Sequence, residues 1–328
     1  MTAVVPTVVM SEIAWERFAP ILEPAVPRVR WRVLHADGTV DSGGEQADVA
    51  WLSNDVFYSG ALPGFLDLLR ADEALRWVQS AGAGVDSPMF QELIARGIRL
   101  STTHATNVPV AEYVIGAVLR LYQQPEQWAA SAAQRAWQHT DFPEIWGTTW
   151  MVIGVGHIGV EIATRVRAFD ARVIGVRRRP QGDEPVDRMI TPSEVLAVLP
   201  EVDVVVVAAP ATGETQHLVN AEFLAAMRES ALLINVARGA LVDEVALVAA
   251  LDAGRPAHAV LDVTEIEPLP PDSPLWAHPR ITVTPHTSGG GEGRFRRAAD
   301  VFAANLARYA RGDALVDEAT GLPRASDS

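Results

Sequence analysis

The sequence predicts an α/β protein built on doubly wound parallel sheets, and three observations predict it. Segments typical of strands alternate with segments typical of helices along most of the 328 residues. In the second half of the chain the strand segments are unbroken runs of Val, Ile and Leu, which indicate strands covered on both faces. A glycine-rich turn also joins one of these strands to a helix, as in doubly wound sheets that bind a ligand.

The first hundred residues alternate between short apolar runs and helical patterns. We expect strands over 7–10, 47–53, 75–81 and 98–103, and helices over 62–69 and 88–97. The second helix would end at Gly97, because glycine readily adopts the backbone conformation that terminates a helix. Strands and helices at this spacing predict βαβ units and a parallel sheet.

A long helical stretch follows, from about Pro109 to Trp137, with apolar residues at helical spacing. Trp128 and Trp137 lie in it. Large aromatic side chains on a long helix are more often part of a core or an interface than of a cofactor site. The stretch therefore predicts a helix that packs against other protein.

The alternation then continues with longer apolar runs. We expect strands over 148–156, 171–178, 202–210, 231–237, 257–263 and 281–285. We expect helices over 157–169, 192–199, 220–228, 243–254 and 294–312. The last seven residues, 322–328, are expected to be frayed.

Composition and charge exclude some classes of function. The net charge of −14 does not favour nucleic acid or an anionic membrane as a partner. The chain has no cysteine, which excludes disulfides, thiolate zinc sites and a cysteine nucleophile, and no lysine, which excludes Schiff-base chemistry on a lysine side chain. We find no signal peptide, no run long enough to span a membrane and no metal-binding cluster, so we expect a cytoplasmic protein without a metal.

The glycine-rich turn reads Gly154-x-Gly156-x-x-Gly159, directly after an expected strand and at the start of an expected helix. Gly154 would permit the tight turn, Gly156 would let the backbone approach a pyrophosphate, and Gly159 would let helix and strand pack closely. The helix opens with His157 and Ile158, where free amides bind phosphates. The turn predicts a dinucleotide site, the alternative being a strand–helix turn without a ligand.

Three consecutive arginines lie at the end of the next strand. A dinucleotide site that takes NAD carries a carboxylate there for the ribose 2′-hydroxyl, about 20 residues beyond the glycines. Here Arg177, Arg178 and Arg179 occupy that place, and arginines suit a 2′-phosphate. The sequence therefore predicts NADP (NADPH) in preference to NAD. The alternative is that the arginines only solvate a loop.

Four motifs in register resemble the D-isomer-specific 2-hydroxyacid dehydrogenases, which include glyoxylate/hydroxypyruvate reductases and phosphoglycerate dehydrogenases. They are "VIGVGHIG", "INVARGALVDEVAL", "VLDVTEIEPLPPDSPLW" and "ITVTPHTSG". Weaker matches extend to "SAGAGVD" and "ATNVPVAEYV". The resemblance implies a Rossmann cofactor domain over 105–288, inserted into a flavodoxin-like substrate domain made of 1–104 and 289–328. It also implies an active site in the cleft between the domains and a homodimer joined through the cofactor domain.

The resemblance also assigns a catalytic set. Arg238 matches the arginine that binds the substrate carboxylate, and its planar fork suits that group. His286 matches the acid–base histidine, and Glu267 the carboxylate that pairs with it. Glu265 is the competing candidate for that carboxylate, and a structural ion pair is the alternative role for Arg238. We expect Gly239 to let the backbone turn sharply beside the ligand.

Further positions follow from the same resemblance. The backbone amides of Gly84 and Val85 would bind the substrate carboxylate. Asp262 would contact the nicotinamide carboxamide, the alternative being a helix or turn cap. Residues that would border the cofactor are Pro210, Thr212, Thr215 and Val236.

Together these residues predict an enzyme that uses a nicotinamide dinucleotide to reduce a small 2-oxo acid to the D-2-hydroxy acid. The alternative is a regulator that senses the dinucleotide with little catalysis, similar to transcriptional corepressors. An adenosylhomocysteine hydrolase is disfavoured by the length of the chain and the spacing from "EIEP" to "TPH". The sequence leaves the identity of the 2-oxo acid open.

Overall fold

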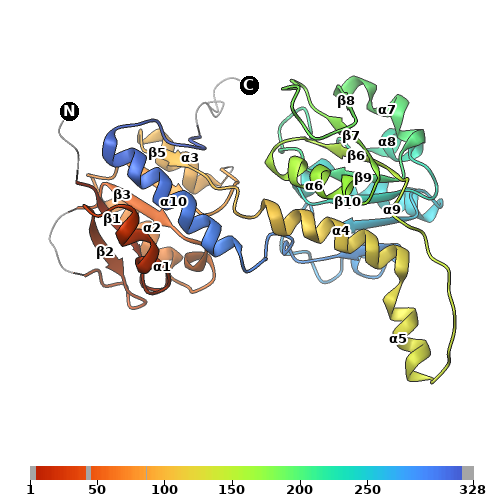
Figure 1. Ribbon diagram of the computed structural model, residues 1–328, viewed down its shortest axis with the longest axis horizontal. Coiled ribbons are helices and arrows are strands. Elements are labelled where there is room, and N and C mark those ends of the chain that lie inside the picture. The colour runs from red at the N-terminus through yellow and green to blue at the C-terminus, as the bar shows by residue number, and fades with distance from the viewer. Residues whose placement is uncertain (1–4, 42–45, 86, 320–328) are drawn as a thin grey trace. The chain divides into compact units, whose positions relative to one another are not determined.

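The computed structural model describes residues 5–41, 46–85 and 87–319, so the expected frayed end over 322–328 lies outside the described residues. The chain divides into two compact units (Figure 1). The first unit joins 1–106 to 292–328, and the second unit is 107–291. The first unit is therefore built from both ends of the chain.

The first unit contains a sheet of five parallel strands in the order β2-β1-β3-β4-β5. The strands are β1 (Thr7–Ser11), β2 (Arg30–Leu34), β3 (Val49–Leu52), β4 (Trp77–Ser80) and β5 (Arg99–Ser101). This is the strand order of flavodoxin-like sheets.

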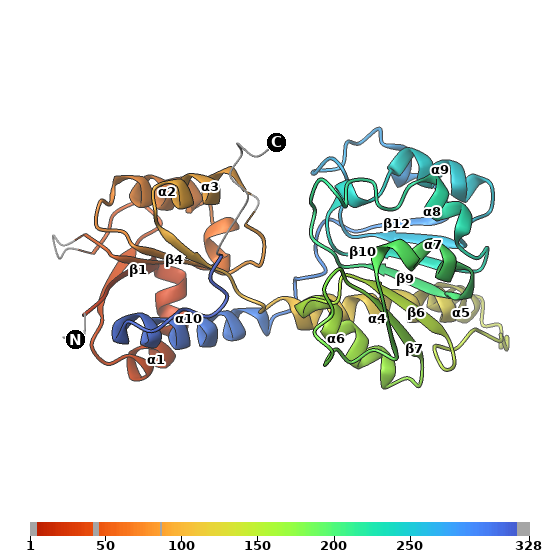
Figure 2. The same ribbon diagram turned by 90° about the horizontal axis from the view of Figure 1, so that it is seen from above.

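Helices cover both faces of this sheet, as Figure 2 shows. Val8 and Met10 of β1 pack with α1 and α10, whereas Val9 between them packs with α2 and α3. The alternation follows from the strand geometry, in which successive side chains point to opposite faces. The helical segments are α1 (Glu12–Ala25), the 3-10 turn η1 (Asn54–Phe57), α2 (Leu62–Ala71), α3 (Pro88–Ala95) and α10 (Arg294–Arg311).

The second unit contains a sheet of seven parallel strands in the order β12-β11-β10-β9-β6-β7-β8. The strands are β6 (Thr149–Ile153), β7 (Arg172–Val176), β8 (Arg188–Ile190), β9 (Val204–Val207), β10 (Leu232–Asn235), β11 (His258–Leu261) and β12 (Ile281–Val283). The strand order reverses between β6 and β9. In such sheets ligands bind outside the carboxyl ends of the strands at the point of reversal.

Two layers of helices enclose this second sheet. Helices α4 and α6 cover one face, and α7, α8 and α9 cover the other. The helical segments are α4 (Asn107–Gln123), α5 (Pro125–Ala133), α6 (His157–Arg167), η2 (Pro192–Glu194), α7 (Val195–Val198), η3 (Leu199–Glu201), α8 (Ala221–Ala226), η4 (Gly239–Leu241), α9 (Glu244–Asp252) and η5 (Pro274–Trp276). The predicted fold class, two doubly wound parallel-sheet domains, is confirmed.

The predicted single helix from Pro109 to Trp137 is wrong, because the structure has two helices there, α4 and α5. Gln124 separates them with a left-handed backbone (φ 50°), and Pro125 opens the second helix. Proline disfavours helical geometry in the residue before it, so the helix cannot run through this point. Trp137 lies beyond α5 and is fully exposed.

Candidate active site

The glycine loop leads from β6 into α6 at the point where the strand order reverses. Gly154 has a φ of +96°, and a Cβ atom on it would lie 2.6 Å from the backbone of Ala209. A Cβ atom on Gly159 would lie 2.2 Å from the carbonyl oxygen of Gly154. Both positions therefore require glycine. Gly156 is different, because a Cβ atom there would meet no heavy atom within 4 Å, so its backbone borders open space.

A pocket of about 560 Å³ lies beside this loop, entirely within the second unit. It brings together most of the residues predicted to bind a dinucleotide. The predicted residues in its lining are Gly154, Gly156, Arg177, Arg178, Arg179, Pro210, Thr212 and Thr215. Of the other predicted residues, His157, Ile158 and Gly159 form the first turn of α6, and Val236 is buried directly after β10.

Two of the three arginines in this pocket have acidic partners. Arg177 forms an ion pair with Glu184 (Nη1 to Oε1, 2.9 Å), and Arg178 forms one with Glu214, which also lines the pocket. Glu184 also accepts hydrogen bonds from the backbone amides of Gln181 and Gly182. These donors, the amide of Gln181 foremost, lower the pKa of Glu184 to about 2. Sequence reasoning missed both partners.

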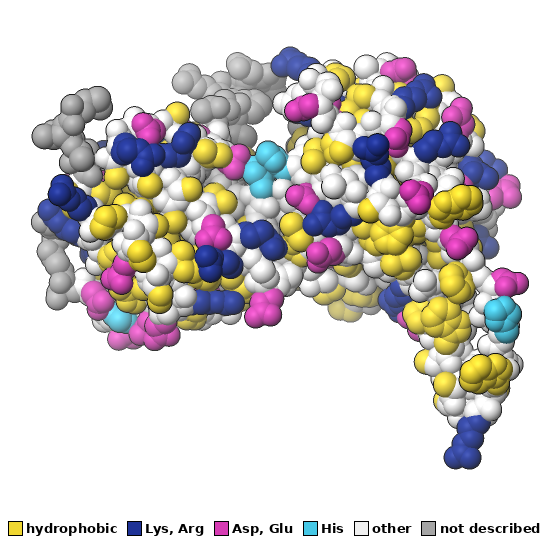
Figure 3. All heavy atoms as spheres, viewed as in Figure 1, with side chains coloured by type: hydrophobic (Ala, Val, Ile, Leu, Met, Phe, Trp, Pro, Cys, Tyr) yellow, Lys and Arg dark blue, Asp and Glu magenta, His cyan; other side chains and the backbone are white. Residues whose placement is uncertain are grey.

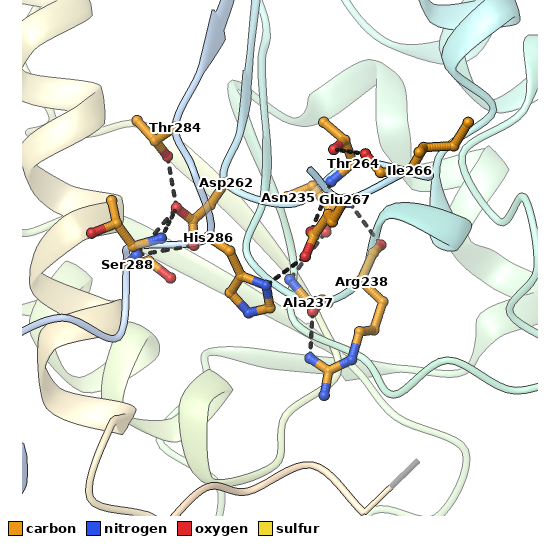
Figure 4. A network of polar contacts seen from close by, with 11 residues as sticks. Asn235, Ala237, Arg238, Asp262, Thr264, Ile266, Glu267, Thr284, His286 and Ser288 are labelled. Atoms are coloured by element: carbon orange, nitrogen blue, oxygen red, sulfur yellow. Dashed lines mark hydrogen bonds and ion pairs between the residues drawn. The ribbon is translucent and has the colours of Figure 1, made fainter. Parts of the chain in front are cut away.

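The predicted histidine and one of its two candidate carboxylates meet at the carboxyl end of the sheet (Figure 4). His286 follows β12, and its Nδ1 atom lies 2.9 Å from Oε2 of Glu267, which follows β11. The second oxygen of Glu267 accepts a hydrogen bond from the amide of Thr264. Glu265 points elsewhere, because its carboxylate pairs with His217 (Oε1 to Nε2, 3.0 Å). The structure thus brings Glu267, and not Glu265, to His286.

Arg238 follows β10, the next strand in the sheet, and Figure 4 shows its guanidinium extending in the same direction as the imidazole of His286. The side chain donates to the carbonyl oxygen of Ala237 (2.8 Å). The carbonyl oxygen of Arg238 accepts from the side-chain amide of buried Asn235 (2.9 Å). Arg238, Glu267 and His286 thus follow three neighbouring strands.

Gly239 opens the 3-10 turn η4, in line with the turn expected there, and the ligand beside it stays a prediction. Its backbone is not left-handed, so the need for glycine comes instead from packing against another segment of the chain. A Cβ atom on it would lie 1.9 Å from the carbonyl carbon of Thr264 and 2.3 Å from the amide nitrogen of Glu265. This close approach places the backbone after Arg238 directly against the segment that leads to Glu267.

Asp262 directly follows the apolar strand β11 and is 1% exposed. Its Oδ1 atom accepts hydrogen bonds from the hydroxyl of Thr284 (2.6 Å) and the amide of Thr287 (2.8 Å). Its Oδ2 atom accepts from the amide of Ser288 (3.0 Å). Asp262 therefore caps the turn that carries His286, and its contact with a nicotinamide stays a prediction.

The predicted substrate loop lies in the first unit, between β4 and α3. The carbonyl oxygen of Val85 accepts a hydrogen bond from the side chain of Gln91 (3.2 Å). The role of the Gly84 and Val85 amides in binding a carboxylate stays a prediction.

In the described ranges, no helix combines the length and the apolar character needed to cross a bilayer.

Comparisons with known proteins point to one family. Residues 115–288 match the model of the D-isomer specific 2-hydroxyacid dehydrogenase, NAD binding domain. The chain is 32% identical to a glyoxylate reductase of Thermofilum pendens over 258 residues, which cover 75% of each chain. It spans about half the length of the D-3-phosphoglycerate dehydrogenases that it matches.

Solved structures show the same similarity over nearly the whole chain. A D-isomer specific 2-hydroxyacid dehydrogenase family protein from Aeromonas salmonicida is 30% identical, with a TM-score of 0.79 and coverage of 96% of this chain and 99% of that one. A D-isomer specific 2-hydroxyacid dehydrogenase from Xanthobacter autotrophicus, in complex with NADPH and MES, is 29% identical, with a TM-score of 0.74 and coverage of 95% and 97%. The fold, the matched domain and these relatives together show that the chain belongs to the D-isomer specific 2-hydroxyacid dehydrogenase family.

Proposed function

We propose that this protein is an NADPH-preferring reductase that converts a small 2-oxo acid, of the glyoxylate or hydroxypyruvate type, to the D-2-hydroxy acid. The observation that carries the proposal is the pairing of His286 with Glu267, with 2.9 Å between Nδ1 and Oε2. The two residues follow β12 and β11, and Arg238 follows β10, the next strand in the same sheet. An acid–base pair and a fixed positive charge are the groups that a carbonyl reduction beside a carboxylate needs.

The second unit fits the dinucleotide. Gly156 borders open space, the glycine loop caps an eleven-residue helix, and a pocket of about 560 Å³ lies beside both. Amides at such a helix end favour a pyrophosphate. When bound, the reduced nicotinamide supplies the hydride. We propose that the second unit holds this cofactor, and that the first unit contributes the Gly84 and Val85 amides to the substrate carboxylate.

Arg238 binds and orients the 2-oxo acid in this proposal. Its guanidinium presents two parallel N–H donors, which match the two oxygens of a carboxylate. The carbonyl oxygen of Arg238 is tied to Asn235, and Gly239 is pressed against Thr264, so the backbone that carries the guanidinium is fixed. A fixed clamp lowers the barrier because the substrate loses its freedom of orientation before the reaction.

His286 donates the proton that the substrate oxygen needs as the carbonyl is reduced. Nδ1 faces Glu267, so Nε2 is the atom left to face the substrate. Glu267 holds the ring in this orientation, and the Thr264 amide holds the carboxylate in turn. In the reverse direction the same nitrogen accepts the proton from the hydroxy acid.

The preference for NADPH rests on the charge of the pocket. Arg177, Arg178 and Arg179 line it together, and arginine binds a phosphate through charge-assisted hydrogen bonds. The relative from Xanthobacter autotrophicus is described in complex with NADPH, which supports the same cofactor here. The pairs with Glu184 and Glu214 compete with a 2′-phosphate for two of these arginines.

We further propose a homodimer joined through the second unit. The segment that carries α5 exposes large apolar side chains, which Figure 3 shows as yellow groups on that part of the molecule. They include Trp128, Trp137, Phe142 and Trp146. Exposed aromatic clusters of this kind are typical of interaction surfaces.

A cytoplasmic location stays a prediction from the sequence.

A panel of 2-oxo acids tests the activity. Glyoxylate, hydroxypyruvate, pyruvate and a bulky aromatic 2-oxo acid are offered to the protein with NADPH and with NADH at equal concentrations, and loss of absorbance at 340 nm is followed. We expect turnover of the small acids, faster with NADPH. Absence of turnover with every acid, together with tight binding of the dinucleotide, would support the regulator instead.

A further inference from the structure

We propose that Tyr113 and Thr284 are positioning residues for His286 and that they act through the buried carboxylate of Asp262. The inference rests on the proposed function, because it concerns the turn that carries the acid–base group. Tyr113 belongs to α4, on one face of the second sheet, and Thr284 directly follows β12. The two residues link a helix to the catalytic turn.

The turn that carries His286 needs outside support. His286 has a φ of 48°, in the left-handed region that residues with a Cβ atom rarely adopt. Such a conformation persists only where surrounding contacts fix it. Asp262 supplies them, because its carbonyl oxygen accepts from the amide of His286 (2.8 Å) and its carboxylate accepts from the amides of Thr287 and Ser288. One residue thus binds three consecutive amides of the turn.

The carboxylate of Asp262 is held in turn by a chain of two hydroxyl groups. Thr284 donates its hydroxyl proton to Oδ1 of Asp262 at 2.6 Å. A hydroxyl has a single proton, so the oxygen of Thr284 accepts in its contact with the Tyr113 hydroxyl at 2.7 Å. Tyr113 is therefore the donor at the far end of the chain. Burial raises the pKa of Tyr113, which keeps this donor protonated at neutral pH.

The chain matters because Asp262 is almost completely buried. A buried carboxylate must fill its lone pairs with donors, and a donor to a charged acceptor contributes more than one to a neutral acceptor. Without the hydroxyl of Thr284 the carboxylate is free to move toward its remaining donors, the amides of Thr287 and Ser288, and the turn that contains these amides moves with it. The imidazole of His286 then leaves the orientation in which Glu267 holds it.

Four variants test this chain. Thr284→Val removes the hydroxyl at nearly constant shape, and Thr284→Ser keeps it. Tyr113→Phe removes one oxygen atom from the far end of the chain. Tyr122→Phe is the matched control, since Tyr122 lies on the same helix and lines the same pocket of about 580 Å³ beneath α4 as Tyr113. Thermal melts confirm that each variant is folded, and the Kd of NADPH is measured by tryptophan fluorescence.

We expect Thr284→Val to lower kcat about tenfold and Tyr113→Phe to lower it about threefold, with the KM of the 2-oxo acid and the Kd of NADPH within about twofold. Thr284→Ser and Tyr122→Phe should stay within about twofold of the wild-type kcat. The double variant Tyr113→Phe/Thr284→Val should be no slower than Thr284→Val alone, because both substitutions break one chain.

Three results would overturn the positioning role. They are additive losses of kcat in the double variant, a change confined to KM, and a kcat of Tyr113→Phe equal to that of Tyr122→Phe. If Thr284→Val does not fold, the positioning role is tested by comparing the kcat of Tyr113→Phe with that of Tyr122→Phe. His286→Ala separates this inference from the proposed function. If His286→Ala keeps the wild-type kcat, the proposed function is wrong. If His286→Ala loses activity while Tyr113→Phe and Thr284→Val keep the wild-type kcat, only the positioning role is wrong.

Discussion

His286 and Glu267 lie side by side, with 2.9 Å between Nδ1 and Oε2, although 19 positions separate them along the chain. They meet because β11 and β12 are parallel neighbours, so the segments that leave them start at the same edge of the sheet. Replacing Glu267 by Gln keeps the shape and removes the charge. We expect kcat to fall by about 10² or more, because general acid catalysis of this kind is worth about 10² to 10⁴.

Glu265→Gln is the matched control for that variant, since Glu265 is two residues away and pairs with His217. It should keep kcat within about threefold of the wild type, a difference of less than 1 kcal/mol in the barrier. Steady-state rates on glyoxylate at saturating NADPH give the comparison. Equal losses in the two variants would remove Glu267 from its proposed role.

Arg238→Lys tests whether the clamp needs a planar fork or only a positive charge. Lysine keeps the charge but offers no two parallel donors, so we expect kcat/KM for the 2-oxo acid to fall about 10²-fold or more. The Kd of NADPH should change little, because the clamp holds the acid and not the dinucleotide. Arg172→Lys, at the exposed start of β7, is the control. A wild-type kcat/KM in Arg238→Lys would contradict bidentate binding.

Because Arg178 and Glu214 form an ion pair, we expect substitutions at the two positions to shift the preference between NADPH and NADH in opposite directions. Arg178→Ala should lower kcat/KM for NADPH about tenfold and leave that for NADH nearly unchanged, because only NADPH carries the 2′-phosphate. Glu214→Gln should raise the ratio of NADPH to NADH efficiency, since Arg178 then has no competing carboxylate there. Glu222→Gln, in the exposed first turn of α8, is the control. A better NADH than NADPH efficiency in the wild type would refute the preference.

Gly239→Ala should destabilise the fold strongly. The new methyl group would lie 1.9 Å from the carbonyl carbon of Thr264, and backbone atoms cannot swing aside as a flexible side chain can. We expect the free energy of unfolding to fall by about 3 kcal/mol. Gly213→Ala is the control, because a Cβ atom there meets no heavy atom within 4 Å. Urea denaturation midpoints of the two variants should differ clearly, and equal midpoints would show that the contact is not tight.

His35 predicts a small dependence of stability on pH in the first unit. Hydrogen bonds to Asp41 and then Glu12 raise the pKa of His35 from 6.5 to about 8. Because the folded pKa is the higher one, this contribution to stability is complete below about pH 6.5 and is lost as the pH rises through 8. NMR titration of the ring gives the pKa directly. In Asp41→Asn the pKa should drop toward 6.5, and an unchanged pKa would exclude Asp41 as its main cause.

The site residues at the strand ends were predictable because the carboxyl ends of parallel strands lie at the same edge of the sheet. Gly154, Arg238 and His286 each directly follow or closely follow an apolar run, and runs of Val, Ile and Leu are visible without any tertiary information. The glycine loop was predictable for the same reason, since the strand and the helix around it mark its place.

Contacts between distant segments were not predictable in this way. The carboxylate partner of Arg178 lies 36 positions away, and the backbone that excludes a side chain at Gly239 belongs to Thr264. Helix α1 is not predicted from the sequence, because Pro20 and Pro24 within it break the usual helical pattern. In the structure Ser11 caps its first turn by accepting from the amide of Ala14, and Phe18 packs in the core.

The contact between Gly239 and the Thr264–Glu265 peptide has a consequence for protein engineering. The backbone after Arg238 packs directly against the backbone of the segment that leads to Glu267. Because this contact is between main-chain atoms, side-chain substitutions cannot adjust the spacing of the two segments. Attempts to broaden the range of acids accepted should leave 239 invariant and randomise pocket walls elsewhere. A selection that nevertheless recovers larger residues at 239 would reveal a second, compensating change in the 264–265 segment.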